Sequence, residues 1–170
     1  MDTLTQRERS KLMAKIRSRG NKGTEVALAK LFRRNKITGW RRQVRISVER
    51  RRSKDESRNV SRARPSTFDP RLAVRPDFVF RQVRLALFVD GCFWHGCPKH
   101  GTKPKGNAAF WRRKFSRNIA RDKLVTRTLR RSGWRVLRIW EHTLRLATKK
   151  PRNEARLLQR IQRSLLPIRK

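Results

Sequence analysis

The feature that most constrains this chain is the apolar segment Leu85–Val89, which runs directly into a turn crowded with reactive side chains. A near-continuous apolar run of this kind is typical of a β-strand that other elements cover on both faces. The turn that follows, 90–100, contains a carboxylate, both cysteines of the chain and two of its three histidines. An ordinary core strand does not end this way. Metal-binding and basic groups gathered at the end of a rigid element indicate a functional site.

Hydrophobic periodicity predicts the other elements around this strand. Helices are expected at 4–19, from a cap at Thr24, at 108–132 and at about 153–166, and strands at 40–46, 77–80 and 134–140. The turn at Gln82-Val83 predicts an antiparallel hairpin between 77–80 and 85–89. The helical crossover before 134–140 predicts a parallel neighbour. The sequence therefore predicts a single α/β domain over 1–170 with a mixed sheet.

The charge of the chain points to a polyanionic partner. Its 170 residues include 48 Lys and Arg against 12 acidic residues, a formal net charge of +36. Such a field favours nucleic acid, whether the protein is an enzyme or a coating protein of the ribosomal or chromatin type. No stretch approaches the ~20 apolar residues of a membrane span, and the N-terminus lacks the apolar run of a signal peptide. We therefore expect a cytosolic, nucleoid-associated protein with no membrane partner, in which paired cysteines indicate a metal rather than a disulfide.

A basic segment interrupts the periodic pattern at 47–74. It is rich in arginine, serine and proline, and predicts a long loop. The segment is either a solubilising insertion or an additional source of phosphate contacts.

Two aspartates lie at the ends of the predicted hairpin strands. Asp77 opens the first strand and Asp90 closes the second, so antiparallel pairing would place the two side by side. Two carboxylates there would repel each other unless a cation lay between them. Both residues are also common at strand ends and turns, so either a metal site or ordinary turn chemistry fits this pattern.

The cysteines and histidines of the turn have the spacing of metal ligands. Cys92, Cys97 and His100 form a C-x4-C-x2-H pattern that could wrap one tetrahedral ion, with His142 as the fourth ligand. The alternative is two reduced cysteines and ordinary surface histidines. If the four are ligands, His95 is free to act as a general base. Asp122, an acid on the buried stripe of helix 108–132, needs a partner, either a basic neighbour or a histidine of the turn.

Two further features have both structural and functional interpretations. Phe93 and Trp94 precede His95, and in so basic a chain they could stack on bases or simply pack in the core. Glu25 lies in the first turn of its predicted helix, and its structural interpretation is a favourable interaction with the helix dipole. Its functional interpretation depends on the family resemblance described next.

Several motifs together carry a family resemblance. The segment VDGCFWHGCPKHG, with PDFVF before it and FW-RK-N-RD (Phe110 to Asp122) and GWRVLRIWEH after it, resembles the very short patch repair (Vsr) DNA mismatch endonuclease family. The N-terminal RSKLMAKIRSRGNKGTEVALAKLFR is similar to the opening of that family as well. The match spans nearly the whole chain except about 47–74 and the last helix.

The resemblance implies a zinc-stabilised variant of the PD-(D/E)xK nuclease fold, a mixed sheet flanked by helices. It implies a magnesium-dependent nick 5′ to the thymine of a T:G mismatch in double-stranded DNA, made by a monomer. In this reading Asp77 holds Mg²⁺ with either the Val89 carbonyl or the Asp90 carboxylate. His95 is the base that activates water, and Asp122 supports it.

The resemblance also assigns the remaining site residues. Glu25 lies at the position of an active-site acid, and helix 4–19 contacts DNA. The residues expected to intercalate beside the mismatch are Phe93, Trp94, Trp111 and Met13. The expected structural zinc ligands are Cys92, Cys97, His100 and His142. Two rivals remain: a restriction or mobile-element nuclease without mismatch preference, and a zinc-stapled DNA-binding protein without activity.

Overall fold

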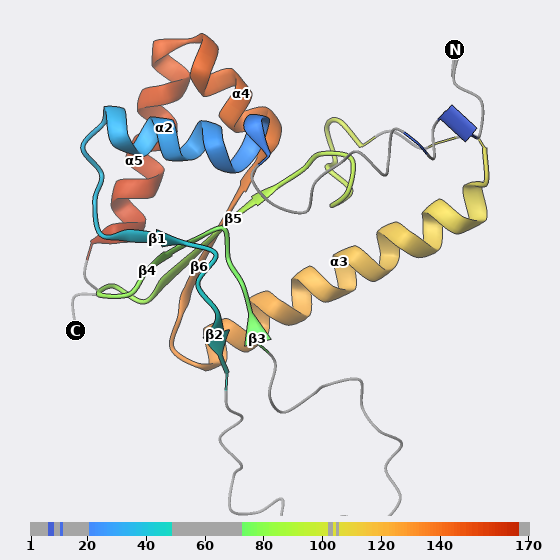
Figure 1. Cartoon of the computed structure of the whole chain (residues 1–170), viewed down its shortest axis with the longest axis horizontal. Helices are drawn as coiled ribbons and strands as arrows, with labels where there is room; N and C mark the ends of the chain where they lie inside the picture. The colour runs from blue at the N-terminus through green and yellow to red at the C-terminus, as the bar shows by residue number, and fades with distance from the viewer. Residues whose placement is uncertain are drawn as a thin grey trace, which may run out of the picture.

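A four-stranded mixed sheet forms the centre of the molecule (Figure 1). The computed structural model describes residues 7, 8, 11, 21–48, 73–101, 104 and 106–166. The strand order is β1 (Trp40–Arg42), β4 (Phe78–Phe80), β5 (Leu85–Asp90) and β6 (Arg135–Trp140). β4 is antiparallel to both β1 and β5, whereas β5 and β6 are parallel. The predicted hairpin and the predicted parallel crossover are therefore both confirmed.

Helices cover both faces of this sheet. α3 (Ala108–Arg131) crosses one face, and α2 (Ala27–Arg34), α4 (Glu141–Lys149) and α5 (Pro151–Leu165) gather on the other (Figure 1). β5 supplies both cores: Leu85 and Leu87 pack in the cluster of α2, α4 and α5, while Ala86 packs with Leu129 of α3. This alternation explains why β5 is apolar at successive positions, because each of its faces packs against a hydrophobic cluster.

The predicted strand at 40–46 is wrong in its extent. β1 ends at Arg42, and the chain forms β2 (Ile46–Ser47), which pairs with β3 (Ala73–Val74) in a separate two-stranded sheet. The break lies at Gln43, whose φ of 53° belongs to the left-handed region that an extended strand cannot contain. Residues 49–72, most of the predicted basic loop, lie outside the described part of the chain, as does most of the helix expected at 4–19, including Met13.

The helix predictions need three corrections. The helix expected to begin with a cap at Thr24 starts earlier, because a π-helical turn, η1 (Lys22–Val26), precedes α2. The last helix, expected at about 153–166, begins at Pro151, a residue favoured in the first helical turn. α4 was not expected at all. It follows β6 directly and buries Leu144 and Ala147.

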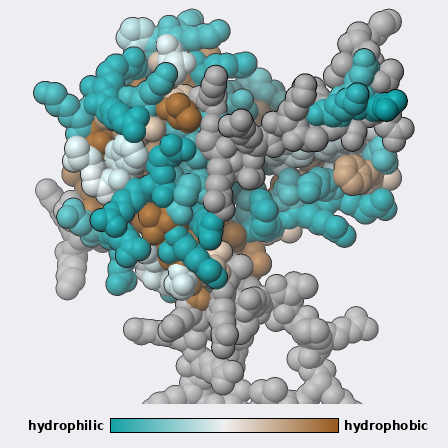
Figure 2. Space-filling view, in the orientation of Figure 1, coloured by the Kyte–Doolittle hydropathy of each residue, from teal (hydrophilic) through white to brown (hydrophobic). Residues whose placement is uncertain are grey.

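The surface agrees with the composition. Hydrophilic residues cover most of the face shown in Figure 2, with small and scattered apolar areas. Among the described residues, no helix is both long enough and apolar enough to cross a lipid bilayer.

Candidate functional site

Asp77 lies where the β4–β5 hairpin meets the turn. It immediately precedes β4, and its Oδ2 accepts a hydrogen bond from the Val89 backbone N–H at 2.7 Å. Among the described residues nothing donates to its other oxygen, Oδ1. Burial, together with the nearby charges of Glu25 and Asp90, raises the pKa of Asp77 to about 6, although the Val89 bond and the charge of Arg138 act to lower it. An incompletely bonded carboxylate among other acids is a fitting ligand for a hard divalent cation.

Glu25 is one of those acids and is almost fully buried, with 3% of its surface exposed. Its Oε2 accepts hydrogen bonds from Arg42 at 2.8 Å and from the Gln43 side chain at 3.1 Å. The backbone N–H of Gln43 in turn bonds to the Asp77 carbonyl. The left-handed turn at Gln43 thus ties Glu25 to the segment that carries Asp77, and Glu25 does more than complement a helix dipole.

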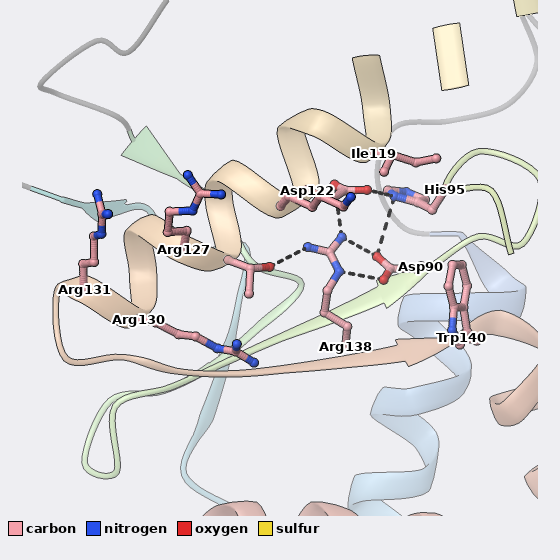
Figure 3. A pocket seen from close by; sticks show the side chains of 11 residues that line it. Asp90, His95, Ile119, Asp122, Arg127, Arg130, Arg131, Arg138 and Trp140 are labelled. Carbon is pink, nitrogen blue, oxygen red and sulfur yellow. Dashed lines mark hydrogen bonds and ion pairs between the residues drawn. The ribbon is translucent and has the colours of Figure 1, made fainter. Parts of the chain in front are cut away.

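A continuous chain of charged groups begins at Asp90, the last residue of β5 (Figure 3). Arg138 of β6 bonds both oxygens of Asp90, at 2.7 and 2.6 Å, and also reaches Asp122 Oδ1 at 3.1 Å. Asp122 Oδ2 meets His95 Nδ1 at 2.5 Å, and Asp90 Oδ1 lies 3.7 Å from the same nitrogen. The expected His95–Asp122 pair is therefore present, and Asp90 lies beside it.

Arg138 is the main site residue that the sequence analysis missed. Burial lowers its pKa, but the two aspartates outweigh that effect and raise it, so the guanidinium stays charged. Its side chain also stacks on Phe88, 4.8 Å from the ring centre. For Asp122, burial raises the pKa, but the bond and charge of His95 and the charge of Arg138 lower it below its usual value. The signal was an arginine in the middle of a largely apolar strand, flanked by Leu137 and Ile139, because a half-buried charge needs a partner.

The other side of the turn gathers the four expected zinc ligands. Side-chain donor atoms of Cys92, Cys97, His100 and His142 all lie within 4.8 Å of one another. His142 Nδ1 is 3.2 Å from Cys92 Sγ and 3.5 Å from Cys97 Sγ, and His100 Nδ1 is 3.9 Å from Cys97 Sγ. Two ligands of one tetrahedral zinc stand about 3.6 Å apart, given the usual Zn–S and Zn–N lengths. The donor set therefore fits a single structural zinc ion.

The local fold explains how these four donors meet. His142 lies in the first turn of α4, directly after β6, and Glu141 beside it accepts a bond from the Cys92 N–H at 3.2 Å. Burial raises the pKa of the Cys92 thiol, as does the neighbouring Cys97. Gly96 has a φ of 63°, and a Cβ there would lie 3.0 Å from the Ile119 side chain. Glycine at 96 therefore lets the turn pack closely on α3 and hold His95 against Asp122.

The three described residues expected to intercalate form an aromatic cluster at the start of α3. The Phe93 ring lies 5.0 Å from that of Trp94 and 5.2 Å from that of Trp111. Asn118 fixes the turn by donating to the Trp94 carbonyl at 2.9 Å. Trp111 is buried, whereas Phe93 and Trp94 are partly exposed and Phe110 next to them is 46% exposed.

These features define a class: an α/β protein with a mixed sheet, whose charged site lies at the ends of its two central strands beside a cysteine–histidine cluster. The sequence model described as DNA mismatch endonuclease Vsr matches residues 63–100. The chain belongs to the Vsr family, and its architecture is consistent with the fold of that family.

Individual relatives match over different spans. The chain is 38% identical to the type II nicking enzyme V.NmeDIP of Neisseria meningitidis serogroup C, over 84% of this chain and 79% of that enzyme. It is 52% identical to the type II nicking enzyme V.NaeI of Lentzea aerocolonigenes over 41% of this chain, and 41% identical to the DNA mismatch endonuclease Vsr of Escherichia coli K12 over 45%. These last two matches span 42% and 50% of the relatives' own lengths.

Proposed function

We propose that the protein is a magnesium-dependent DNA endonuclease that nicks one strand 5′ to the thymine of a T:G mismatch. The observation that carries the proposal is the constellation at the ends of β5 and β4. The His95–Asp122 pair lies beside Asp90 there. Asp77 accepts a hydrogen bond from the Val89 N–H on one carboxylate oxygen, and its other oxygen has no donor among the described residues. Family membership supports a nuclease, and the formal charge of +36 supports double-stranded DNA as the substrate.

Asp77 is the carboxylate that we assign to Mg²⁺. Both oxygens of Asp90 accept bonds from Arg138, whereas Asp77 Oδ1 has no donor among the described residues. This contrast favours Asp77 with the Val89 carbonyl as protein ligands, with Asp90 serving to hold Arg138. Bound Mg²⁺ supplies charge neutralisation at the phosphate and a lower pKa for coordinated water.

His95 is the general base of the proposal. The Asp122 carboxylate at 2.5 Å from Nδ1 favours the tautomer that carries its proton on Nδ1. Nε2 is then left with a lone pair that can take a proton from an attacking water. Arg138 holds the other oxygen of Asp122, so the orientation of the imidazole is fixed by the sheet through two successive side chains.

Mismatch preference is assigned to the aromatic cluster and Met13. Phe93 and Trp94 lie in the turn that carries His95, and the ring of Trp111 in α3 packs against both of them. Wedging a side chain into duplex DNA costs unstacking energy, and this cost is smaller at a mismatched pair. The relatives named as type II nicking enzymes support an alternative, a restriction-associated nickase without mismatch preference.

The deciding experiment compares nicking of a T:G duplex with that of its T:A counterpart, with and without Mg²⁺, under single-turnover conditions. We expect a nick 5′ to the mismatched thymine only with Mg²⁺. Equal nicking of both duplexes supports the restriction-associated alternative, and tight binding without any nick supports a non-catalytic DNA-binding protein. Changing His95→Ala is expected to slow the nick by about 10²–10⁴-fold at neutral pH. A wild-type rate in that variant would exclude His95 as the base.

A further inference from the structure

The charged chain at the end of β5 opens into a groove along α3 (Figure 3). At one end the groove is lined by Asp90, His95, Asp122 and Arg138, whose charges are paired with one another. From there it runs along the C-terminal half of α3, where Lys123, Arg127, Arg130 and Arg131 line it. The groove therefore joins a catalytic end, whose charged groups are paired with one another, to a strongly cationic end.

The cations of this second end are unpaired within the described part of the chain. Lys123, Arg127, Arg130 and Arg131 are all exposed, and none makes an ion pair or a side-chain hydrogen bond with a described residue. The one acid of α3, Asp122, is already engaged by His95 and Arg138. Four like charges within nine residues of helix repel one another, so an anion bound there would relieve a cost that the fold leaves in place.

The spacing of the four side chains suits a run of phosphates rather than a single anion. Positions 123, 127, 130 and 131 recur at three and four residues and so share one side of the helix. At 1.5 Å of rise per residue, they extend over about 12 Å. One strand of B-form DNA advances 3.4 Å per phosphate, so this length corresponds to about three phosphates.

We propose that this α3 face is a phosphate-binding subsite that holds the backbone of double-stranded DNA next to the phosphate that is cut. The inference rests on the proposed function, because the catalytic end of the groove identifies the neighbouring phosphate. Lys123 lies next to Asp122 and contacts the nearest phosphate, and the three arginines hold those that follow. The subsite recognises backbone charge and is indifferent to base sequence.

The test uses the full chain and two triple variants of equal charge. Arg127→Gln, Arg130→Gln and Arg131→Gln together remove the groove arginines while keeping side-chain length and helix propensity. The matched control, Arg152→Gln, Arg156→Gln and Arg163→Gln, removes three exposed arginines of α5, on the opposite face of the sheet (Figure 1). Thermal unfolding confirms that both variants fold. Binding of a T:G duplex is then measured against salt without Mg²⁺, and again with single methylphosphonates that neutralise one phosphate at a time.

The groove variant is expected to lower the salt slope of log K by about 2–3, since each lost phosphate contact contributes about 0.9. The α5 control is expected to lower it by less than about 1. In the wild type, two or three successive methylphosphonates on one side of the nick weaken binding, and in the groove variant the same replacements have no further effect.

Equal salt slopes and an unchanged phosphate pattern in the two variants would overturn the subsite. Nicking and binding separate the two proposals. If the methylphosphonate effect is present in the wild type and absent in the groove variant, but the wild type makes no nick, the phosphate subsite stands and the proposed function is wrong. If the wild type nicks the T:G duplex but the groove variant shows the same methylphosphonate pattern as the wild type, the proposed function stands and the phosphate subsite is wrong.

Discussion

The turn between β5 and α3 separates two groups of polar side chains that are satisfied in opposite ways. On one side, two thiols and two imidazoles lie within 4.8 Å of one another, enough donors to complete a tetrahedral shell. On the other side, Asp77 keeps a free oxygen among the described residues and carries an elevated pKa. A closed shell suits a metal that only holds the fold together, whereas an open one leaves room for water and substrate. The comparison supports the proposal that places the chemistry at Asp77 rather than at the cysteine–histidine cluster.

The largest expected effect comes from the open region. Asp77→Ala is expected to reduce single-turnover nicking of a T:G duplex by more than about 1000-fold, because metal stabilisation of the transition state amounts to several kcal/mol. DNA affinity is expected to stay within about twofold, since phosphate contacts from Lys and Arg dominate it. Glu154→Ala, which removes an acid bound to Asn35 and Arg34 far from the turn, is the control for charge. An unchanged nicking rate in the Asp77 variant would remove the metal assignment.

The next effect distinguishes the two sides of the turn with one type of substitution. His142→Ala is expected to lose bound zinc, measured by elemental analysis, and several kcal/mol of unfolding free energy, because metal binding and folding are coupled. His95→Ala is expected to keep about one zinc per chain, since His95 pairs with Asp122 outside the cluster. Zinc loss in both variants, or a folded wild type without zinc, would contradict the division of the turn into two sites.

This division was largely predictable from the sequence. With two cysteines and three histidines in the chain, assigning four of them to one ion leaves His95 free, and the structure groups those four side chains. The β4–β5 hairpin and the parallel β6 were predictable because apolar strands and a long amphipathic helix leave few alternative topologies. The turn, the strands and the helix that together support the site could thus be identified before any coordinates.

What could not be predicted depends on register and on backbone conformation. Arg138 meets Asp90 because β5 and β6 pair in parallel with Phe88 opposite Arg138, a register that hydrophobic pattern alone does not define. The strand expected at 40–46 breaks at Gln43, where a left-handed residue binds Glu25 and the Asp77 carbonyl. α4 was missed because Glu141 and His142 were interpreted as the end of a strand, although Leu144 and Ala147 already have helical spacing.

The smallest effect tests whether the buried negative charge of Asp77 lowers the free energy of unfolding when no cation is bound. Burial raises the pKa of Asp77 from 3.8 to about 6, so the folded protein keeps a proton that the unfolded chain releases between those values. Stability should therefore fall as the pH rises through this window. Asp77→Asn keeps an acceptor for the Val89 N–H but carries no charge. It is expected to raise the unfolding free energy above pH 6 by up to about 3 kcal/mol and to change little below pH 4.

Denaturant unfolding from pH 3.5 to 8 in Mg²⁺-free buffer measures this difference directly. Adding Mg²⁺ at pH 8 should then stabilise the wild type and leave the Asn variant unchanged, because a ligand stabilises only the state that binds it. A gain for the Asn variant that is the same at pH 3.5 and pH 8 would mean that shape, not charge, separates the two side chains. In the predicted case the same carboxylate costs stability without the cation and regains it on binding. The closed cysteine–histidine cluster should show no such response to Mg²⁺, because thiols and imidazoles are poor ligands for that ion.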